Sequence, residues 1–303
     1  MKYNIVCVAD EGYVQHAAVM LSSLFETNSE KSFCIYFMTY TLSEKSKNGL
    51  NSLCNAHNSQ IIFIEDNYKI IKDFKVGQWN TIMYLKLLVP QYLPKDVERY
   101  LFLDVDMIIN SDITELYHYD LGNNIIAACE DIPDCIIHKK RLNLPNDSTY
   151  INSGVIVVDL KAWRAKDEDW IECMNRKEVD FINDQDVIAT YFENEIKVLP
   201  IKWNMVTFYY MRKPKIFEKY LATLEYDKKN PCIIHFPCPI KPWFKDCKHP
   251  YAHMYRKHLS KTDWKDYEFP YFEKLSKWGR FKKYIRNILN EAGIIKDEMF
   301  LIK

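Results

Sequence analysis

Two aspartates interrupt an apolar stretch of the sequence, "RYLFLDVDMII", at residues 99–109. Burying an ionised carboxylate is costly unless it is paired, hydrogen-bonded or bound to a metal. If the stretch is one strand, Asp104 and Asp106 point to the same side, about 6–7 Å apart. Two carboxylates at the carboxyl end of a strand can hold a hard divalent cation. The alternative is a turn pair after the strand, since "NSD" follows closely.

A second candidate for chemistry is "CIIHFPCPIKPWF", residues 232–244. His235 ends an apolar run and could supply an imidazole to the same cation, and Lys241 is a point charge suited to a phosphate. A packed loop with a hydrogen-bonded histidine is the simpler interpretation. A zinc site is a further alternative, although the spacing of its ligands matches no regular finger pattern; it would use Cys232, His235, Cys238 and Cys247.

Three short polar clusters could contact a ligand. Asn152, Ser153 and Gly154 precede an apolar strand, where a glycine allows close approach of the backbone. Residues 183–186, "NDQD", gather acids and amides at the predicted start of a helix. Asp10 ends the first predicted strand. Taken alone, the Asn152–Gly154 cluster is better explained by a turn into the strand, and helix capping can explain the cluster at 183–186. Asp10 has the same two interpretations.

The elements that must position these residues alternate between strands and helices. Apolar runs at 3–10, 32–40 and 59–66 read as strands, and residues 13–28 and 42–57 have helical periodicity. This alternation predicts an α/β fold with a mostly parallel sheet. Further along, we expect a helix at 80–94 stopped by Pro90 and Pro94, strands at 99–109, 124–131 and 150–160, a helix at 183–194, and a late strand and loop at 230–243.

The bulk composition excludes several classes of protein. The chain has 303 residues and a formal net charge of zero, which removes the simple electrostatic case for nucleic-acid binding. No apolar run reaches the length of a membrane span. Nine scattered cysteines, with no secretory signal before the first strand, indicate reduced thiols in a cytoplasmic protein.

The C-terminal region differs in composition from the rest. Residues 274–286 contain six basic side chains and no acid, and apolar residues recur there at helical spacing. We expect a basic amphipathic helix in a tail at 261–303, following a catalytic domain at 1–260. The tail could attach peripherally to an anionic membrane, such as the inner face of the plasma membrane, or pack on the domain with its lysines in solvent.

Taken together and in order, these motifs resemble the retaining glycosyltransferases of family eight, which include bacterial lipopolysaccharide galactosyl- and glucosyltransferases and are related to glycogenin. The resemblance runs from about Asn4 to Trp243. It is carried by "VCVADEGY", "YLKLLVP", "YLFLDVDMII", "YINSGVIVVDLKAWR", "NDQDVIATYF" and "HFPCPIKPW". It implies a GT-A fold, a UDP-hexose donor, Mn²⁺ or Mg²⁺ as cofactor, and a saccharide or lipid-linked oligosaccharide acceptor of a surface glycan.

The resemblance also implies roles for individual residues. The metal ligands would be Asp104, Asp106 and His235. Uracil and ribose would lie against Val8, Ala9, Asp10 and Tyr13, and Lys241 would bind the diphosphate. Val105 and Cys238 would also belong to the nucleotide-sugar site. The transferred sugar would be surrounded by Lys86, Asn152, Ser153, Asp184 and Gln185, with Asp131 near the acceptor. The catalytic candidates are Asp184, Gln185 and Asp186, and the sequence leaves open whether Gln185 or Asp186 is a nucleophile or the acceptor attacks on the leaving-group side.

Two departures from the family pattern keep other functions open. Lys86 stands where bacterial members usually have arginine, so a bidentate fork is lost, and Cys238 stands at a usual glycine position. These departures are compatible with a non-catalytic sugar-nucleotide-binding protein. A phosphohydrolase of the haloacid dehalogenase type also places Asp-x-Asp after an apolar strand, but its motif normally lies near the start of the domain.

Overall fold

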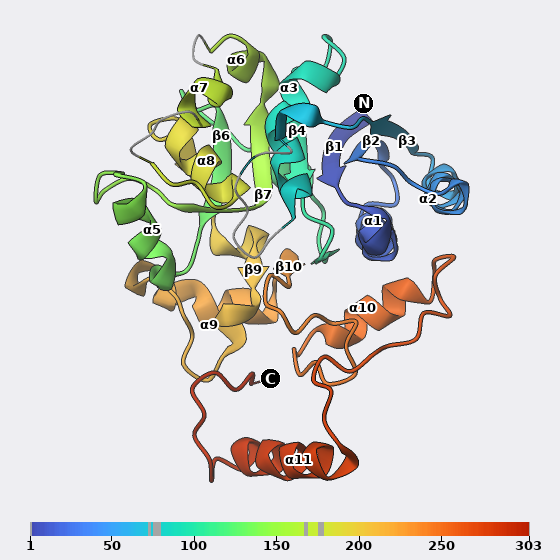
Figure 1. Cartoon of the computed structure of the whole chain (residues 1–303), viewed down its shortest axis with the longest axis vertical. Helices are drawn as coiled ribbons and strands as arrows, with labels where there is room; N and C mark the ends of the chain where they lie inside the picture. The colour runs from blue at the N-terminus through green and yellow to red at the C-terminus, as the bar shows by residue number, and fades with distance from the viewer. Residues whose placement is uncertain (1, 72–73, 75–79, 167–168, 175–178, 303) are drawn as a thin grey trace.

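The computed structural model describes residues 2–71, 74, 80–166, 169–174 and 179–302. Its main feature is a seven-stranded sheet in the order β3-β2-β1-β4-β7-β6-β8 (Figure 1). The strands are β1 Lys2–Val8, β2 Ser32–Thr39, β3 Gln60–Glu65, β4 Arg99–Leu103, β6 Ile126–Glu130, β7 Ile151–Asp159 and β8 Ile196–Val198. Strands β3, β2, β1 and β4 are mutually parallel, whereas β7 is antiparallel to both β4 and β6. The predicted α/β class with a mostly parallel sheet is confirmed.

Helices cover both faces of this sheet. The α-helices of the described residues are α1 Val14–Thr27, α2 Glu44–Ala56, α3 Val89–Tyr92, α4 Thr114–Tyr117, α5 Ile136–Arg141, α6 Leu160–Arg164, α7 Trp170–Met174, α8 Asp184–Tyr191, α9 Leu221–Lys229, α10 Ala252–Leu259 and α11 Lys277–Glu291. One apolar core joins the sheet to α1 and α2, and the other joins it to α6 and α8. Since side chains alternate along each strand, neighbouring residues such as Ile5 and Val6 enter opposite cores.

A small second sheet contains β5 Met107–Ile109, β9 Met205–Val206 and β10 Ile233–His235, in the order β5-β10-β9. The prediction of one strand over 99–109 is therefore wrong. The chain leaves the main sheet at Leu103 and enters the small sheet at Met107, so Asp104 and Asp106 lie in the connection. Both halves are equally apolar because both are buried, and apolarity does not reveal which sheet a strand joins.

Two other local predictions need correction. Residues Thr81–Leu88 form a 3₁₀-helix, and Pro90 lies in the first turn of α3 instead of stopping a helix. A first-turn residue has no intrahelical partner for its N–H, so proline fits there. Asn152 and Gly154 lie inside β7 and not in a turn before it. Because Leu103 pairs with Val155, the polar residues Asn152 and Ser153 lie beside the carboxyl end of β4.

The predicted C-terminal helix is present as α11, at the end of the molecule opposite α6 (Figure 1). Ser276 caps its start by accepting a hydrogen bond from the Gly279 backbone N–H. The segment after α11 returns to the main body, where Leu301 pairs with Met211 as an antiparallel bridge. The division at residue 260 stays a prediction. Within the described ranges, no helix is long and apolar enough to span a bilayer.

Candidate active site

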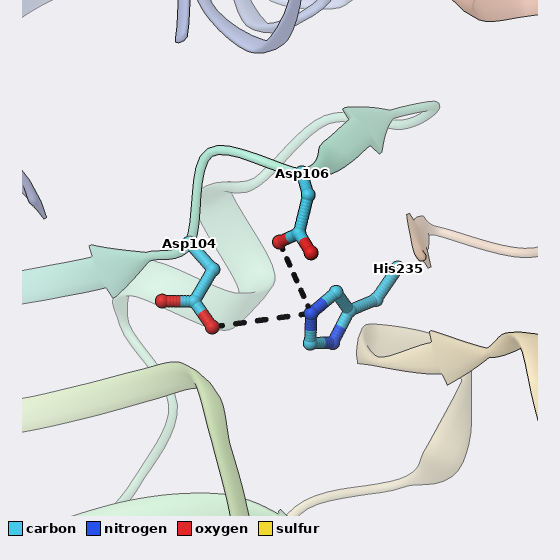
Figure 2. A group of neighbouring side chains, drawn as sticks. All are labelled: Asp104, Asp106 and His235. Carbon is cyan, nitrogen blue, oxygen red and sulfur yellow. Dashed lines mark ion pairs between the residues drawn. The ribbon is translucent and has the colours of Figure 1, made fainter. Parts of the chain in front are cut away.

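Asp104, Asp106 and His235 converge where β4 ends (Figure 2). Nε2 of His235 lies 3.3 Å from Oδ1 of Asp106 and 3.9 Å from Oδ2 of Asp104. One ligand atom from each of the three residues lies within 4.8 Å of the others. The two carboxylates and one imidazole nitrogen form a donor set that suits Mn²⁺ or a similar divalent cation. The predicted ligands therefore lie together, although they are 131 residues apart between Asp104 and His235.

The backbone holds this cluster in place. β10 pairs with β5 so that His235 stands opposite Met107, one residue beyond Asp106. The backbone N–H of Asp104 donates to the carbonyl of Gly154 at 2.8 Å, and the N–H of Phe236 donates to the carbonyl of Asp106 at 3.0 Å. The connection between the two sheets is thus fixed at both ends, and both carboxylates are aimed at the histidine.

Gly154 is required by this close packing. A Cβ atom at position 154 would lie 2.5 Å from Cε1 of His235, 2.8 Å from the Met107 side chain and 3.0 Å from Oδ2 of Asp104. The sequence suggested close backbone approach at this glycine, but to a bound ligand. In the structure the neighbours that need the space are the metal-ligand candidates themselves.

The charges of the two aspartates are set differently. Burial alone would raise the pKa of Asp106, but Lys241 and His235 outweigh it and hold that pKa well below its usual range. Nζ of Lys241 lies 2.6 Å from Oδ2 of Asp106 and donates to the carbonyl of Phe236, also at 2.6 Å. Burial raises the pKa of Asp104, against the attraction of Lys86. The cluster therefore carries a firmly ionised carboxylate beside the lysine expected to contact the diphosphate.

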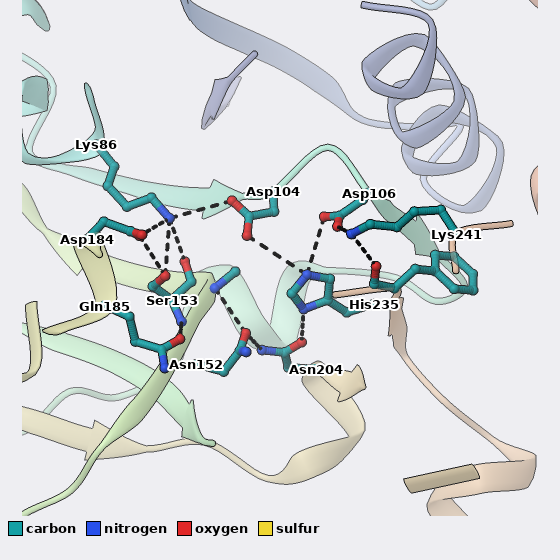
Figure 3. Close-up of polar contacts among 12 residues, drawn as sticks. Lys86, Asp104, Asp106, Asn152, Ser153, Asp184, Gln185, Asn204, His235 and Lys241 are labelled. Atoms are coloured by element: carbon teal, nitrogen blue, oxygen red, sulfur yellow. Dashed lines mark hydrogen bonds and ion pairs between the residues drawn. The ribbon is translucent and has the colours of Figure 1, made fainter. Parts of the chain in front are cut away.

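Lys86 forms the other charged centre of the site (Figure 3). Its Nζ lies 2.6 Å from Oδ2 of Asp184 and 3.5 Å from Oδ1 of Asp104. It also donates to the hydroxyl and the carbonyl of Ser153, at 3.2 and 3.3 Å. Burial would lower the pKa of Lys86, but Asp104 and Asp184 raise it above its ordinary value. A single lysine ammonium thus reaches both carboxylates.

Gln185 is held by a defined pair of hydrogen bonds. Its Nε2 donates to Oδ2 of Asp131 at 2.6 Å, and its Oε1 accepts from the backbone N–H of Ser153 at 3.1 Å. Asp131 follows β6, Ser153 lies in β7 and Gln185 in α8, so three elements fix one amide. The structure places Asp131 against Gln185, next to Asp184 and Lys86.

The Asp186 carboxylate is bonded to a different set of residues from those that contact Asp184 and Gln185. Asp186 is fully buried, and its carboxylate accepts hydrogen bonds from Arg141, Tyr150 and the backbone N–H of Ile182, at 2.8, 2.8 and 2.9 Å. Asn183 caps the start of α8 by accepting from the Asp186 N–H. The "NDQD" cluster therefore has two roles. Asn183 caps the helix, and the first turn of α8 directs Asp184 and Gln185 toward the cation cluster.

The predicted nucleotide residues lie where β1 ends. Val8 is the last residue of β1, and the Ala9 backbone N–H donates to the carbonyl of Met38 at 3.3 Å. Oδ1 of Asp10 is buried and has no hydrogen-bond partner within the described part of the chain. Tyr13 is 41% exposed and its ring meets Trp243 edge-on at 5.8 Å. Oδ1 of Asp10 can accept a hydrogen bond from an N–H or O–H group of a ligand, and the Tyr13 ring can pack against the same ligand.

The alternative zinc site is not formed. Among the described residues, the only cluster of three or more acidic, histidine or cysteine side chains that could hold a metal is that of Asp104, Asp106 and His235. Cys232, Cys238 and Cys247 stay outside it. Burial raises the pKa of the Cys238 thiol to about 11.

Asn204 was missed by the sequence analysis. It is fully buried between a 3₁₀-helix at Ile201–Trp203 and β9, and it contacts His235 directly. The available signal was a single amide in the apolar run "WNMV", which lies far from every recognised motif. A buried amide needs hydrogen-bond partners, but the sequence alone does not name them.

Known proteins of one family are similar to this chain in sequence. Residues 4–247 match the model of the family described as "Glycosyl transferase family 8". The chain is 27% identical over 279 residues to General stress protein A of Bacillus subtilis, covering 86% of this chain and 94% of that protein. It is 24% identical over 272 residues to a lipopolysaccharide 1,2-glucosyltransferase of Escherichia coli, covering 87% of this chain and 79% of that protein.

A solved structure supports the fold. The galactosyltransferase LgtC, in complex with donor and acceptor sugar analogues, superposes with a TM-score of 0.73 at 22% identity, covering 92% of this chain and 99% of that one. The mixed sheet flanked by helices is thus the GT-A fold. Because the family model spans most of the sequence, the chain belongs to glycosyl transferase family 8 and is a glycosyltransferase.

Proposed function

We propose that this glycosyltransferase moves a hexose, glucose or galactose, from a UDP-sugar to a saccharide or lipid-linked acceptor of a surface glycan, with retention of configuration. The observation that carries the proposal is the convergence of Asp104, Asp106 and His235 beside Lys241 on one side and Lys86 on the other. The Escherichia coli relative is named for glucosyl transfer to lipopolysaccharide, which supports a hexose and a surface glycan.

The cation cluster and Lys241 would act on the donor diphosphate. Asp104, Asp106 and His235 would hold a divalent cation such as Mn²⁺, which would supply Lewis-acid neutralisation of the charge on the leaving UDP. Lys241, now 2.6 Å from Asp106, stands where it can bind a diphosphate oxygen. Asp10 and Tyr13, where β1 ends, would hold the ribose and the base.

Lys86, Asp184 and Gln185 would position the transferred sugar. The Lys86–Asp184 pair offers a donor and an acceptor to sugar hydroxyls, and Ser153 keeps both in place. The Gln185 oxygen already accepts one hydrogen bond and retains a second lone pair that can stabilise positive charge at the anomeric carbon. Asp186 is committed to Arg141 and Tyr150, so we assign it a positioning role for α8.

Turnover of UDP-glucose, UDP-galactose, UDP-N-acetylhexosamines and a GDP-sugar, each with Mn²⁺, Mg²⁺ or a chelator, tests this proposal. We expect Mn²⁺-dependent release of UDP from one UDP-hexose above all others. Preference for the GDP-sugar, or full activity in chelator, would contradict it. Tight UDP binding without turnover of any UDP-sugar would favour the non-catalytic alternative, and p-nitrophenyl phosphate hydrolysis with Mg²⁺ would favour the phosphohydrolase.

We also propose that α11 contacts an anionic membrane, where a lipid-linked acceptor would lie. Only Asn290 of this 15-residue helix is buried. Trp278, Phe281 and Tyr284 are 62%, 51% and 58% exposed, with five basic side chains on the same helix. Exposed aromatic rings together with Lys and Arg are typical of interfacial helices.

Co-sedimentation with vesicles containing anionic lipid tests the membrane contact. Replacing Trp278 and Phe281 by serine removes the apolar contact but leaves the charge and the anchoring of the tail through Arg212 unchanged. We expect this variant to stay in the supernatant while the wild-type chain sediments. Equal sedimentation of both proteins would contradict the proposal.

A further inference from the structure

A chain of amides connects the β7 backbone to the histidine of the cation cluster (Figure 3). The Gly154 N–H donates to Oδ1 of Asn152 at 3.2 Å. The same oxygen accepts from Nδ2 of Asn204 at 2.8 Å. Oδ1 of Asn204 lies 2.9 Å from Nδ1 of His235. All three side chains are buried, at 9% exposure or less, so these bonds do not exchange freely with water.

The Gly154 N–H determines which atom is the donor and which is the acceptor in each of these hydrogen bonds. A backbone N–H can only donate, so the atom of Asn152 that faces Gly154 must be its oxygen. The atom of Asn204 that faces that oxygen must then be the NH₂ group, because two oxygens at this distance would repel. The remaining atom of Asn204 is its oxygen, so Nδ1 of His235 must carry the hydrogen.

We infer that Asn204 and Asn152 are positioning residues that keep a hydrogen on Nδ1 of His235, so that Nε2 is the nitrogen available to a cation held between Asp104 and Asp106. Nε2 is the atom that lies 3.3 Å from Asp106 and 3.9 Å from Asp104. A neutral imidazole binds a metal through its unprotonated nitrogen, and the bond at the other nitrogen decides which one that is. The relay thus prepares the nitrogen that the cation needs.

The relay also explains why β7 carries "NSG" at this position. Gly154 contributes its N–H to the amide chain, its carbonyl to the Asp104 backbone and its missing side chain to the space occupied by His235. Asn152, expected from the family resemblance to contact the sugar, has its oxygen committed to the relay. One strand segment therefore orients both the carboxylate and the imidazole ligands.

The inference rests on the proposed cation site, and two measurements separate the two ideas. The first is a two-bond ¹H–¹⁵N correlation spectrum of the metal-free wild-type chain labelled in histidine, in which the tautomers have different patterns. A His235→Gln variant identifies the signal. We expect His235 to carry hydrogen on Nδ1, and a spectrum dominated by the Nε2–H form would overturn the relay whether or not a metal binds.

The second measurement is Mn²⁺ affinity by electron paramagnetic resonance of free Mn²⁺. Asn204→Leu keeps the approximate volume and removes both hydrogen bonds, and we expect it to weaken Mn²⁺ binding by about 10–100-fold. The matched control is Asn28→Leu. Asn28 is also buried and bonded to the backbone at Leu24 and Ile113, but it lies between α1 and the segment before α4.

Both variants should lose stability, whereas only Asn204→Leu should lose Mn²⁺ affinity. Wild-type Mn²⁺ affinity in Asn204→Leu would overturn the inference, as would an equal loss of affinity in the two variants. If the wild-type chain binds no Mn²⁺, the proposed cation site fails, and the tautomer measurement still decides the relay. If Asn204→Leu does not fold, the wild-type spectrum decides it alone.

Discussion

Nζ of Lys86 lies 2.6 Å from Oδ2 of Asp184, and both side chains are buried. The pair joins the 3₁₀-helix at Thr81–Leu88 to the start of α8, on either side of the space next to Asp104. Removing one member of a buried ion pair leaves an uncompensated charge, which is far more costly than the net value of the pair.

We therefore predict that Lys86→Met lowers the free energy of unfolding by about 3–5 kcal/mol, as measured by urea denaturation. The matched control is Lys161→Met. Lys161 pairs with Glu98, and both side chains are mostly exposed, so the loss should be about 0–1 kcal/mol. A loss below that of the control would show that Lys86 is not part of a buried pair.

Gly154→Ala should distort the cation cluster. The added Cβ would meet Cε1 of His235 at 2.5 Å, and overpacking of this kind costs about 1–3 kcal/mol. We predict a chain that still folds but binds Mn²⁺ at least about tenfold more weakly, as measured by calorimetric titration. Gly279→Ala in the exposed helix α11 serves as the control and should bind Mn²⁺ normally. Unchanged Mn²⁺ affinity in Gly154→Ala would contradict the packing described for β7.

Asp131 should affect the chemical step through Gln185. The 2.6 Å hydrogen bond from Gln185 Nε2 to Asp131 is charge-assisted, and such bonds contribute about 1.5–3 kcal/mol. We predict that Asp131→Ala lowers kcat by about 10–100-fold with little change in KM for the UDP-sugar.

A control for this effect lies three residues further on. Asp134 makes a surface ion pair with Lys215, and Asp134→Ala should leave both kinetic constants unchanged. If Asp131→Ala raises KM for the acceptor and leaves kcat unchanged, Asp131 binds the acceptor and does not orient Gln185.

The stability of the protein should fall as the pH drops below about 6.5, partly because of His16. This side chain is 3% exposed, stacks on Trp243 at 3.5 Å and bonds to the Tyr255 hydroxyl, and burial lowers its pKa to about 3. A histidine buried in the neutral form stabilises the fold above its unfolded pKa, and this contribution is lost as the unfolded chain takes up a proton. Between about pH 7.5 and about pH 5.5 the loss is about 1.4 kcal/mol for one such histidine.

His16→Phe keeps an aromatic ring against Trp243 and removes the titration. The variant should lose stability at both pH values, because the bond to Tyr255 is gone, but the difference between the two pH values should shrink by about 1.4 kcal/mol. Urea denaturation at each pH measures this difference. The same pH dependence in both proteins would mean that His16 can be protonated without unfolding.

The sequence predicted most of the secondary structure because local rules decide it. The apolar runs of β1, β2 and β3 and the periodicity of α1 and α2 were recognised, and Asn183 caps α8 as its residue type suggests. The sequence does not predict that the chain passes from the main sheet to the small sheet between Leu103 and Met107, because both residues are equally buried. That choice depends on pairing with β7 and β10, which are distant in sequence.

The sequence singles out most of the candidate site, including the neutral residues Asn152, Ser153 and Gln185, but it does not single out Asn204. Asp104, Asp106 and His235 could be identified because a carboxylate or imidazole next to an apolar strand demands an explanation. Asn204 carries no charge and no motif, and its role depends on contacts with Asn152 and His235 that only the fold creates.

The central claim is that Asp104, Asp106 and His235 hold a divalent cation against the diphosphate of a UDP-sugar. The most direct test is calorimetric titration of UDP into the wild-type chain and Asp106→Asn, each with Mn²⁺ and with a chelator. We predict that the wild-type chain binds UDP at least about tenfold more tightly with Mn²⁺ than with chelator, and that Asp106→Asn loses this difference. Equal UDP affinity under all four conditions would contradict the claim.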